Sequence, residues 1–353
     1  MKDSLNKKVL LITGGAGFIG SNFLEFLLKK YSHYKLINID NLTYAGNLEN
    51  LVHIETSNNY TFIKGDICNR ELLEHIFNFY DIRGVIHFAA ESHVDNSITS
   101  PNNFIRTNII GTFTLLEVAR SYWMMGPGKY KKGYEDCRFH HISTDEVYGS
   151  LGKEGFFTER SPYAPRSPYS ASKASSDMIV KSYYHTYGLN IIITNCSNNY
   201  GPKQAREKFI PKIIESALNY NSIPVYGDGT NVRDWLYVTD HCRGIDVVYH
   251  FGKIGETYNI GGNNERQNNY VVEKVCEILD EIIPLDDREN NGIKSFKDLI
   301  SYVKDRPGHD RRYAVDTTKI SQELGWRPVE NFEETLRETV IWYTGDINRK
   351  VLL

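Results

Sequence analysis

The sequence has few cysteines, and they stand far apart. The five cysteines form no C-x-x-C pair and are odd in number; they are Cys68, Cys137, Cys196, Cys242 and Cys276. This spacing argues against a disulfide scaffold and a zinc module, and it is typical of a reduced, cytoplasmic chain. No apolar run approaches the roughly 20 residues that a membrane-spanning helix needs. We therefore expect a cytoplasmic protein with no membrane partner and no metal site.

Neither sign of charge dominates the sequence. There are 41 lysines and arginines against 44 aspartates and glutamates, which gives a formal net charge of −3. Such a balance lends no support to a nucleic-acid partner or to binding at a membrane surface. The apolar run Val9–Ile12 is shorter than the core of a signal peptide, which needs about 7–15 residues. Hydrophobic residues make up 41% and charged residues 24%, as in a folded protein with a substantial core.

Apolar runs alternate with amphipathic stretches through the first 200 residues. Val9–Ile12 and Gly84–Phe88 are short and mostly apolar, as expected of strands that are buried on both faces of a parallel sheet. Further strands are predicted at residues 36–39, 60–63, 139–143 and 191–195, and helices at residues 71–80, 104–121 and 170–187. Strands that alternate with helices predict an α/β fold with a doubly wound parallel sheet of the Rossmann type.

The length of 353 residues favours two domains, since a domain has about 150 residues on average. We predict a Rossmann domain over residues 1–200 and a smaller mixed α/β domain, which binds the substrate, over residues 201–353. A strand and a helix within residues 232–251 are predicted to return to the first domain. Residues 123–137 and 284–295 are predicted loops, because glycine, proline and charged residues gather there.

Three glycines follow the first predicted strand. Gly14, Gly17 and Gly20 stand in the pattern G-x-x-G-x-x-G between a strand and a helix. In a dinucleotide site the first glycine allows a tight turn, the second lets the backbone approach a pyrophosphate, and the third lets helix and strand pack. The positive end of the helix dipole adds to phosphate binding. The pattern therefore predicts a dinucleotide site; the alternative is that the glycines serve only a tight turn.

An acidic residue ends the second predicted strand. Asp40 lies twenty residues beyond Gly20, where a carboxylate accepts hydrogen bonds from a ribose diol and repels a 2′-phosphate. The next three residues include no arginine; they are Asn41, Leu42 and Thr43. NAD is therefore the predicted cofactor rather than NADP. The alternative is that Asp40 caps a loop.

A tyrosine and a lysine stand four positions apart near the start of a predicted helix. Tyr169 and Lys173 therefore share one face of that helix. A phenol is a poor base because its pKa is near 10, and a neighbouring ammonium favours the phenolate and lowers that pKa. The pair predicts a general base with a lysine that can also hold the nicotinamide ribose.

A cluster of hydrogen-bonding residues follows another predicted strand. Thr144, Asp145 and Glu146 come just after Ile142, at the sheet edge where such folds carry their chemistry. Thr144 can bond a substrate hydroxyl. Two acids in different environments can divide the work, one donating a proton and the other accepting one, but the spacing does not say which. The alternative is a polar turn in which one acid caps a helix.

The sequence resembles the extended short-chain dehydrogenase/reductase superfamily and, within it, the 4,6-dehydratases that act on dTDP-glucose. The resemblance covers nearly the whole chain. It rests on the motifs TGGAGFIGSN (13–22), DNLTYAGN (40–47), HFAAESHVD (87–95), HHISTDEVYG (140–149), SPYSASKASSD (167–177), TNCSNNYGP (194–202), NVRDWLYV (231–238), YNIGG (258–262) and DRPGHDRRYAVD (305–316).

The resemblance implies two adjoining binding sites. The implied NAD site consists of Gly14, Gly17, Phe18, Ile19, Gly20, Asp40, Asn41, Leu42, Thr43, Asp66, Ile67, Ala89, Ala90, Ser92, Thr107, Tyr169, Lys173 and Asn199. The implied sugar-nucleotide site consists of Ser92, Thr144, Asn198, Lys208, Phe209, Pro224, Tyr226, Arg233, Asn268, Asp305, Arg306 and His309.

The resemblance also implies a reaction and an assembly. Tyr169 would take the proton of the carbon-4 hydroxyl while NAD accepts a hydride, Glu146 would remove the carbon-5 proton, and Asp145 would protonate the departing carbon-6 hydroxyl. Thr144 and Lys173 complete the implied catalytic set. The product would be dTDP-4-keto-6-deoxyglucose, from which deoxysugars such as rhamnose are made. The implied assembly is a homodimer, in which two helices of the larger domain form a four-helix bundle with the partner.

Three other functions remain open at this point. A 4,6-dehydratase of UDP-glucose could carry the same catalytic residues. A nucleotide-sugar 4-epimerase would share Tyr169 and Lys173, but it expels no water and has no need of the two acids. A protein that senses NAD without catalysis would be expected to lose Tyr169 or Lys173, and this sequence keeps both.

Overall fold

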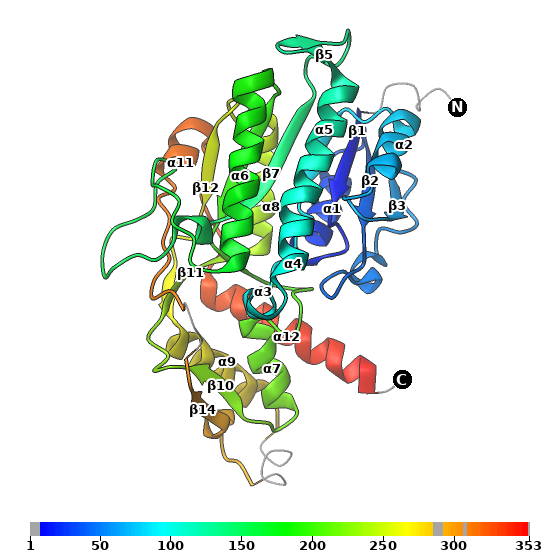
Figure 1. Ribbon diagram of the computed structural model, residues 1–353. Helices are drawn as coiled ribbons and strands as arrows, with labels where there is room; N and C mark the ends of the chain where they lie inside the picture. Colours follow the sequence, from blue (N-terminus) through cyan, green and yellow to red (C-terminus); the bar gives the residue numbers. More distant parts are fainter. Residues whose placement is uncertain (1–7, 285–291, 306–308, 352–353) are drawn as a thin grey trace.

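A parallel sheet forms the larger part of the molecule (Figure 1). The computed structural model describes residues 8–284, 292–305 and 309–351. Seven strands follow the order β12-β8-β7-β4-β1-β2-β3, and each neighbouring pair is parallel. Their bounds are β1 Lys8–Thr13, β2 Tyr34–Asp40, β3 Tyr60–Lys64, β4 Gly84–His87, β7 Arg138–Thr144, β8 Ile191–Cys196 and β12 Thr257–Ile260. The strand order reverses between β1 and β4, and such a switch point opens a crevice at the carboxyl ends of the strands.

Helices cover both faces of the sheet, as predicted for a doubly wound fold. One face packs against α1 (Phe18–Lys30), α8 (Val238–Phe251) and α11 (Thr318–Leu324). The other face packs against α2 (Arg70–Tyr80), α5 (Thr112–Trp123) and α6 (Pro168–Tyr187). Alternate residues of β1 serve the two cores: Leu10 and Ile12 face α1, and Leu11 faces the opposite layer. The predicted fold class is therefore confirmed.

The sequence fixes where α6 begins and ends through its caps. The hydroxyl of Ser167 accepts from the Ser170 N–H, and the Ser170 side chain accepts in return from the backbone N–H of Ser167. Pro168 occupies the first turn, and Gly188 ends the helix in the left-handed conformation at φ 69°. Each of these is a preferred capping device. The caps set the register of the helix that carries Tyr169 and Lys173.

The predicted helix over 104–121 is helical throughout, but its first part is π-helical rather than α-helical. The structure has α3 (Val94–Thr99), α4 (Pro101–Phe104) and then a π-helical segment, Ile105–Gly111, before α5. The wide turns place the Asn108 amide inside, where it bonds to the backbone of Glu91 and to Ser172. Contacts this distant leave no periodic signal in the sequence. The predicted loop at 123–137 also contains a short hairpin, β5 (Met124–Gly126) and β6 (Lys129–Tyr130).

A smaller group of elements packs below the carboxyl ends of the sheet (Figure 1). It has an apolar core of its own, to which Ile214, Trp235, Val272 and Leu336 contribute. The sheets in it are mixed, since β10 pairs with β14 and β9 with β11 in parallel, whereas β11 and β13 are antiparallel. The bounds are β9 Asn198–Tyr200, α7 Phe209–Leu218, β10 Ile223–Tyr226, β11 Val232–Tyr237, β13 Glu265–Gln267, α9 Asn268–Ile282, β14 Ile300–Val303 and α12 Phe332–Val351.

The hydrophobic core between α2, α5 and the sheet supports a stability prediction. Trp123 is 0% exposed, contacts the Phe77 ring and donates its indole N–H to the Ile82 carbonyl at 2.8 Å. We expect Trp123→Ala to lower the free energy of unfolding by about 3–5 kcal/mol through lost burial and a cavity. Urea titration measures this. The neighbouring Met125 is 71% exposed, so Met125→Ala should change stability by less than about 0.5 kcal/mol. Equal losses in the two variants would contradict this account of the core.

Candidate active site

A cavity of about 300 Å³ lies at the carboxyl ends of the central strands. Its walls come from both groups of elements, because the loops after β1, β2, β4 and β7 face the segment around β9. It brings together most of the residues singled out from the sequence. These are Gly14, Gly17, Phe18, Ile19, Gly20, Asp40, Asn41, Thr43, Asp66, Ile67, Ala89, Ala90, Ser92, Thr107, Thr144, Asp145, Glu146, Tyr169, Lys173, Asn198, Asn199 and Lys208.

Two glycines of the turn, Gly14 and Gly20, pack so closely against the protein backbone that neither could carry a side chain. Gly14 has φ 73°, and a Cβ there would lie 2.6 Å from the Ala89 backbone nitrogen. A Cβ at Gly20 would lie 2.5 Å from the Gly14 carbonyl oxygen. Gly17 differs, because its φ is −77° and a Cβ would meet no atom nearer than 3.3 Å. Gly17 is also the N-cap of α1 and offers no side-chain cap, so the helix N-terminus is open to an anion.

Asp40 ties the glycine turn to the end of β2. Its Oδ2 accepts from the Ala16 N–H at 2.9 Å, and its Oδ1 accepts from the Leu42 N–H at 2.8 Å. Burial raises the pKa of this carboxyl, and the two backbone hydrogen bonds oppose that effect. Leu42, at φ 53°, does not line the cavity, and its N–H orients Asp40 instead.

The chain's own residues fit a dinucleotide with an unphosphorylated ribose. The cradle around Gly14 and Gly20 would be filled by a Cβ, the first turn of α1 is uncapped by a side chain, and a buried carboxylate ends β2. These are the three features that such a site needs: close backbone approach, an anion-binding helix end and an acceptor for a diol. A cofactor such as NAD would therefore be held by the glycine turn and Asp40.

Tyr169 and Lys173 lie side by side in a buried part of the cavity. The Tyr169 ring packs edge-on against Phe104, with 6.3 Å between ring centroids. The Lys173 Nζ donates to the Ile142 carbonyl oxygen at 2.8 Å. Burial lowers the pKa of Lys173 to about 8, and the carboxylate of Asp177 works against that fall.

The expected lowering of the Tyr169 pKa by Lys173 is wrong for the chain as it stands. Burial raises the pKa of Tyr169 well above 10, and the negative charge of Glu146 adds to the rise. A hydrogen bond with the Thr144 hydroxyl opposes them. The physical reason is the burial of the phenol, and the Lys173 ammonium donates to the Ile142 carbonyl. Tyr169 therefore rests as a neutral phenol.

The two adjacent acids occupy different environments. Asp145 opens the short 3-10 helix Asp145–Tyr148 and is 2% exposed, and its Oδ2 has no hydrogen-bond partner. Burial first, and then the negative charges of Glu146 and Asp234, raise the pKa of Asp145 well above its usual range. The raised pKa favours the protonated form of Asp145, which can donate a proton. Glu146 is more exposed. This difference in environment favours Asp145 as the proton donor of the pair, and the assignment of the two roles stays a prediction.

Several predicted sugar-nucleotide residues lie outside the cavity wall. These are Phe209, Pro224, Tyr226, Arg233, Asn268, Asp305 and His309. Arg233 is buried with its guanidinium 4.5 Å from the Tyr313 ring centroid, and its charge lowers the pKa of Asp145. His309 Nδ1 lies 2.6 Å from Asp305 Oδ1 and its ring contacts Tyr226. Arg306 lies outside the described residues. The binding roles of all eight stay predictions.

Sequence reasoning missed Glu91 as a residue of the site. Glu91 is 9% exposed and lines the cavity. The Asn108 amide holds its backbone, since Asn108 Oδ1 accepts from the Glu91 N–H at 2.8 Å and Nδ2 donates to the Glu91 carbonyl at 3.0 Å. Its place four residues after the end of β4, within HFAAESHVD, was the available signal. Cys196, Gln204 and Ala205 also line the cavity and were not singled out.

Membrane-spanning helices and clusters of metal ligands are both absent from the described part of the chain. No helix in residues 8–284, 292–305 and 309–351 combines the length and the apolar character needed to cross a membrane. Within the same residues, no three or more histidine, cysteine, aspartate or glutamate side chains are grouped as metal ligands.

Comparisons with known proteins agree with one another. The model of the GDP-mannose 4,6 dehydratase family matches residues 11–339. The dTDP-glucose 4,6-dehydratase of Neisseria gonorrhoeae is 51% identical, and the match covers 98% of each chain. The crystal structure of dTDP-glucose 4,6-dehydratase from Bacillus anthracis with NAD superposes with a TM-score of 0.83 at 49% identity, covering 97% of this chain and 98% of that one. For the Streptomyces venezuelae enzyme of the same name, also with NAD bound, the TM-score is 0.85 at 42% identity, and the coverages are 96% and 98%.

The open face of Gly17 supports a prediction about cofactor binding. We expect Gly17→Ala to fold, because its backbone suits alanine and the nearest atom lies 3.3 Å from the new Cβ. The methyl group would stand where a pyrophosphate must approach, so NAD affinity should fall roughly tenfold or more, about 1.4 kcal/mol. Calorimetric titration with NAD and a thermal melt measure the two effects.

Gly14→Ala is the matched control for Gly17→Ala. Its Cβ would clash with the Ala89 backbone and its φ is 73°, so both stability and NAD binding should be lost. An unchanged NAD affinity in a folded Gly17→Ala protein would contradict the assignment of this turn to the pyrophosphate.

Proposed function

This chain belongs to the family of dTDP-glucose 4,6-dehydratases, within the extended short-chain dehydrogenase/reductase superfamily, and on that premise we propose that it converts dTDP-glucose into dTDP-4-keto-6-deoxyglucose. It is a hydro-lyase with NAD as cofactor. The observation that carries the proposal is the buried Asp145 beside Glu146, within one cavity that also holds Tyr169 and the glycine turn. An oxidation that needs no loss of water would not require such a pair of acids.

When bound, NAD supplies an acceptor for the carbon-4 hydride and a donor of the same hydride to carbon 6. The chain's residues supply the proton transfers. Tyr169, which rests as a neutral phenol, must first release its own proton to solvent. As the phenolate it takes the proton of the carbon-4 hydroxyl while the ketone forms, and the Thr144 hydroxyl, which bonds Tyr169, stabilises that phenolate. Lys173, one helical turn away, supplies the positive charge that a buried phenolate needs.

Elimination of water uses the two acids in opposite directions. The carbon-5 proton is acidic once carbon 4 is a ketone, and Glu146 removes it as base. Asp145, whose pKa is raised by burial and by the charge of Glu146, gives a proton to the carbon-6 hydroxyl. The carbon–oxygen bond at carbon 6 breaks and water leaves. Glu146 returns its proton to carbon 5 when carbon 6 is reduced, and Asp145 regains a proton from solvent.

The exposed face of the helices around α5 and α6 supports a homodimer. Ile105, Ile110 and Phe113 of the π-helical segment and α5 are each more than two-fifths exposed, and so is Met178 of α6. Figure 1 shows α5 and α6 next to each other on one side of the molecule. Two such helices from each of two chains can form a four-helix bundle that buries these side chains. We also propose a cytoplasmic location, because all five cysteines are free.

The label on carbon 4 gives the test of the proposed reaction. With dTDP-glucose that carries deuterium at carbon 4, the deuterium should appear in the carbon-6 methyl group of the product, as read by mass spectrometry and NMR. Loss of the label to solvent would overturn the internal hydride return. A parallel assay with UDP-glucose distinguishes the two dehydratases, and formation of a carbon-4 epimer would instead identify an epimerase.

The role of Glu146 has its own readout in the same assay. Glu146→Gln should lower kcat by about 10²–10⁴-fold, the usual range for loss of a general base. It should also abolish exchange of the carbon-5 proton with deuterated solvent, while some transient NADH still forms. Full carbon-5 exchange in this variant would contradict the assignment of Glu146 as base.

The proposed dimer interface is tested by a single charge. Phe113→Glu should shift the protein from dimer to monomer in sedimentation equilibrium, because a carboxylate would be buried in an apolar contact. Phe251 ends α8, which covers the opposite face of the sheet, and is 72% exposed, so Phe251→Glu serves as the control and should stay dimeric. A wild-type protein that sediments as a monomer of 40.6 kDa would remove the proposal.

A further inference from the structure

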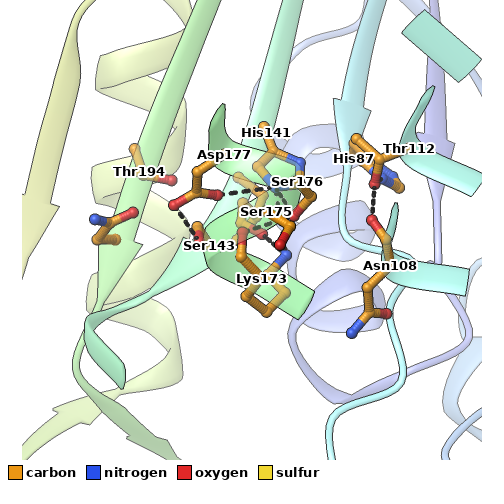
Figure 2. A network of polar contacts seen from close by, with 12 residues as sticks. His87, Asn108, Thr112, His141, Ser143, Lys173, Ser175, Ser176, Asp177 and Thr194 are labelled. Carbon is orange, nitrogen blue, oxygen red and sulfur yellow. Dashed lines mark hydrogen bonds and ion pairs between the residues drawn. The ribbon is translucent and has the colours of Figure 1, made fainter. Parts of the chain in front are cut away.

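A buried carboxylate lies one helical turn beyond Lys173. Asp177 of α6 is 0% exposed and points between two residues of β7, Ser143 and His141 (Figure 2). Its Oδ2 accepts from the Ser143 hydroxyl at 2.9 Å and from the Tyr163 hydroxyl at 2.9 Å. Its Oδ1 lies 3.2 Å from His141 Nε2. The group does not line the cavity, and the reaction described above makes no use of it.

A carboxylate in such a place needs a positive charge nearby, and Lys173, four residues earlier on α6, provides it. The Lys173 Nζ lies 3.5 Å from His141 Nε2, the same atom that lies 3.2 Å from Asp177 Oδ1. An ionised carboxyl buried without a partner costs several kcal/mol. The pKa of Asp177 is raised by burial to only about 6, and the positive charge of Lys173 heads the influences that hold it down. In turn, Asp177 is the main influence that raises the pKa of Lys173 against its burial. The two residues therefore form a coupled pair on one face of α6.

The other titratable groups around this pair carry little charge at neutral pH. Burial lowers the pKa of His141 on β7 and of His87 on β4 well below 6.5, so both are neutral. Burial raises the pKa of the Cys196 thiol on β8 to about 12. Tyr169 and Tyr163 are neutral phenols, and Lys181 is a second cation that faces Asp177. Among the described residues, Asp177 is thus the carboxylate that balances Lys173.

We propose that Asp177 is the internal counter-ion of Lys173 and a positioning residue for the dehydration reaction. Its charge keeps the Lys173 ammonium protonated beside Tyr169. Its hydrogen bond to Ser143, the neighbour of Thr144, also holds the end of β7 against α6. Lys173 lies in a site that excludes most water, and without Asp177 it would release its proton and leave Tyr169 without a nearby cation. The effect on turnover rests on the proposed function; the effect on the charge of Lys173 does not.

An anchoring role and a counter-ion role differ in what an amide can replace. Asp177→Asn has the same shape and can still accept from Ser143 and Tyr163, so it would preserve an anchor. It removes the negative charge, so it would not preserve a counter-ion. Tyr163→Phe does the reverse, because it deletes one hydrogen bond to Oδ2 and keeps the charge. The two variants together separate the two roles.

The charge of Lys173 can be read without any turnover. Trace acetylation by acetic anhydride modifies only neutral amines, and peptide mass spectrometry can follow Lys173 against the exposed Lys64. In the purified enzyme the midpoint for Lys173 should lie near pH 8. In Asp177→Asn it should fall by about one to two pH units, the effect of removing a nearby opposite charge. In Tyr163→Phe it should stay near the wild-type value. A wild-type midpoint in folded Asp177→Asn would overturn the proposal.

The pH profile of kcat/KM for dTDP-glucose gives the functional readout. The basic limb should move to lower pH in Asp177→Asn by about the same one to two units, because the ammonium is lost earlier as pH rises. Asp177→Glu, which keeps the charge, should restore part of the alkaline activity. A shifted acetylation midpoint without turnover of dTDP-glucose in any variant would overturn the proposed function and leave the counter-ion. If the pH profile of kcat/KM is the same in Asp177→Asn as in the wild type, the counter-ion role of Asp177 is overturned and the proposed function is unaffected.

A second pair of variants covers the case in which Asp177→Asn does not fold. Lys173→Met leaves Asp177 buried without its cation and should lower the urea midpoint of unfolding. Adding Asp177→Asn to Lys173→Met removes the unpaired charge, so the double variant should regain stability relative to Lys173→Met. A double variant that is less stable than Lys173→Met would contradict the pairing.

Discussion

The close contact between α6 and the carboxyl end of β7 is the constraint on which the site depends. The Lys173 ammonium donates to the Ile142 carbonyl, and Ser143 and His141 contact Asp177. These contacts set how far Tyr169 stands from Thr144, Asp145 and Glu146. The glycine turn forms another wall of the cavity, and Asn108 holds the backbone of Glu91, which also lines it. The register between this helix and this strand therefore decides whether the cavity holds a working set of groups.

Burial gives the members of that set different protonation states. Asp145 and Glu146 are neighbours in the chain, yet Asp145 is enclosed with one oxygen unpartnered, while Glu146 reaches the more open part of the cavity. Lys173 and Asp177 are enclosed together, and their opposite charges limit the effect that burial has on either pKa. The same low-dielectric surroundings thus neutralise an isolated acid and preserve a paired one. The surroundings of each side chain, more than its residue type, therefore decide whether it acts as proton donor, as proton acceptor or as cation.

Much of the fold could be predicted from short patterns. Apolar runs such as Val9–Ile12 indicated the parallel strands, and the glycines with Asp40 indicated the turn that now forms one wall of the cavity. The π-helical segment could not be predicted, because it depends on Asn108 bonding to Glu91 and Ser172, 17 and 64 positions away.

The sequence indicated which residues lie in the site, but it indicated their protonation states and contacts less well. The spacing of Tyr169 and Lys173 placed both on one face correctly. The pKa of Tyr169, however, depends first on its burial among elements distant in the sequence, and the Lys173 ammonium bonds to a carbonyl of β7. Asp177 stands at the same helical spacing beyond Lys173, so a periodic signal existed. Only the packing of β7 and Tyr163 around it shows that this carboxylate is enclosed.

The strand order of the main sheet has a consequence for synthesis of the chain. β12, at residues 257–260, pairs with β8 and closes that side of the sheet, and α8 covers part of the same region. A nascent chain that has emerged only as far as residue 200 would therefore present β8, with Ile191, Ile192 and Ile193, as an unpaired apolar border. Exposed borders of this kind recruit other strands and favour aggregation. Roughly sixty more residues must be synthesised before β12 can pair with β8 and cover this edge of the sheet. The nascent chain is therefore prone to aggregation during this interval.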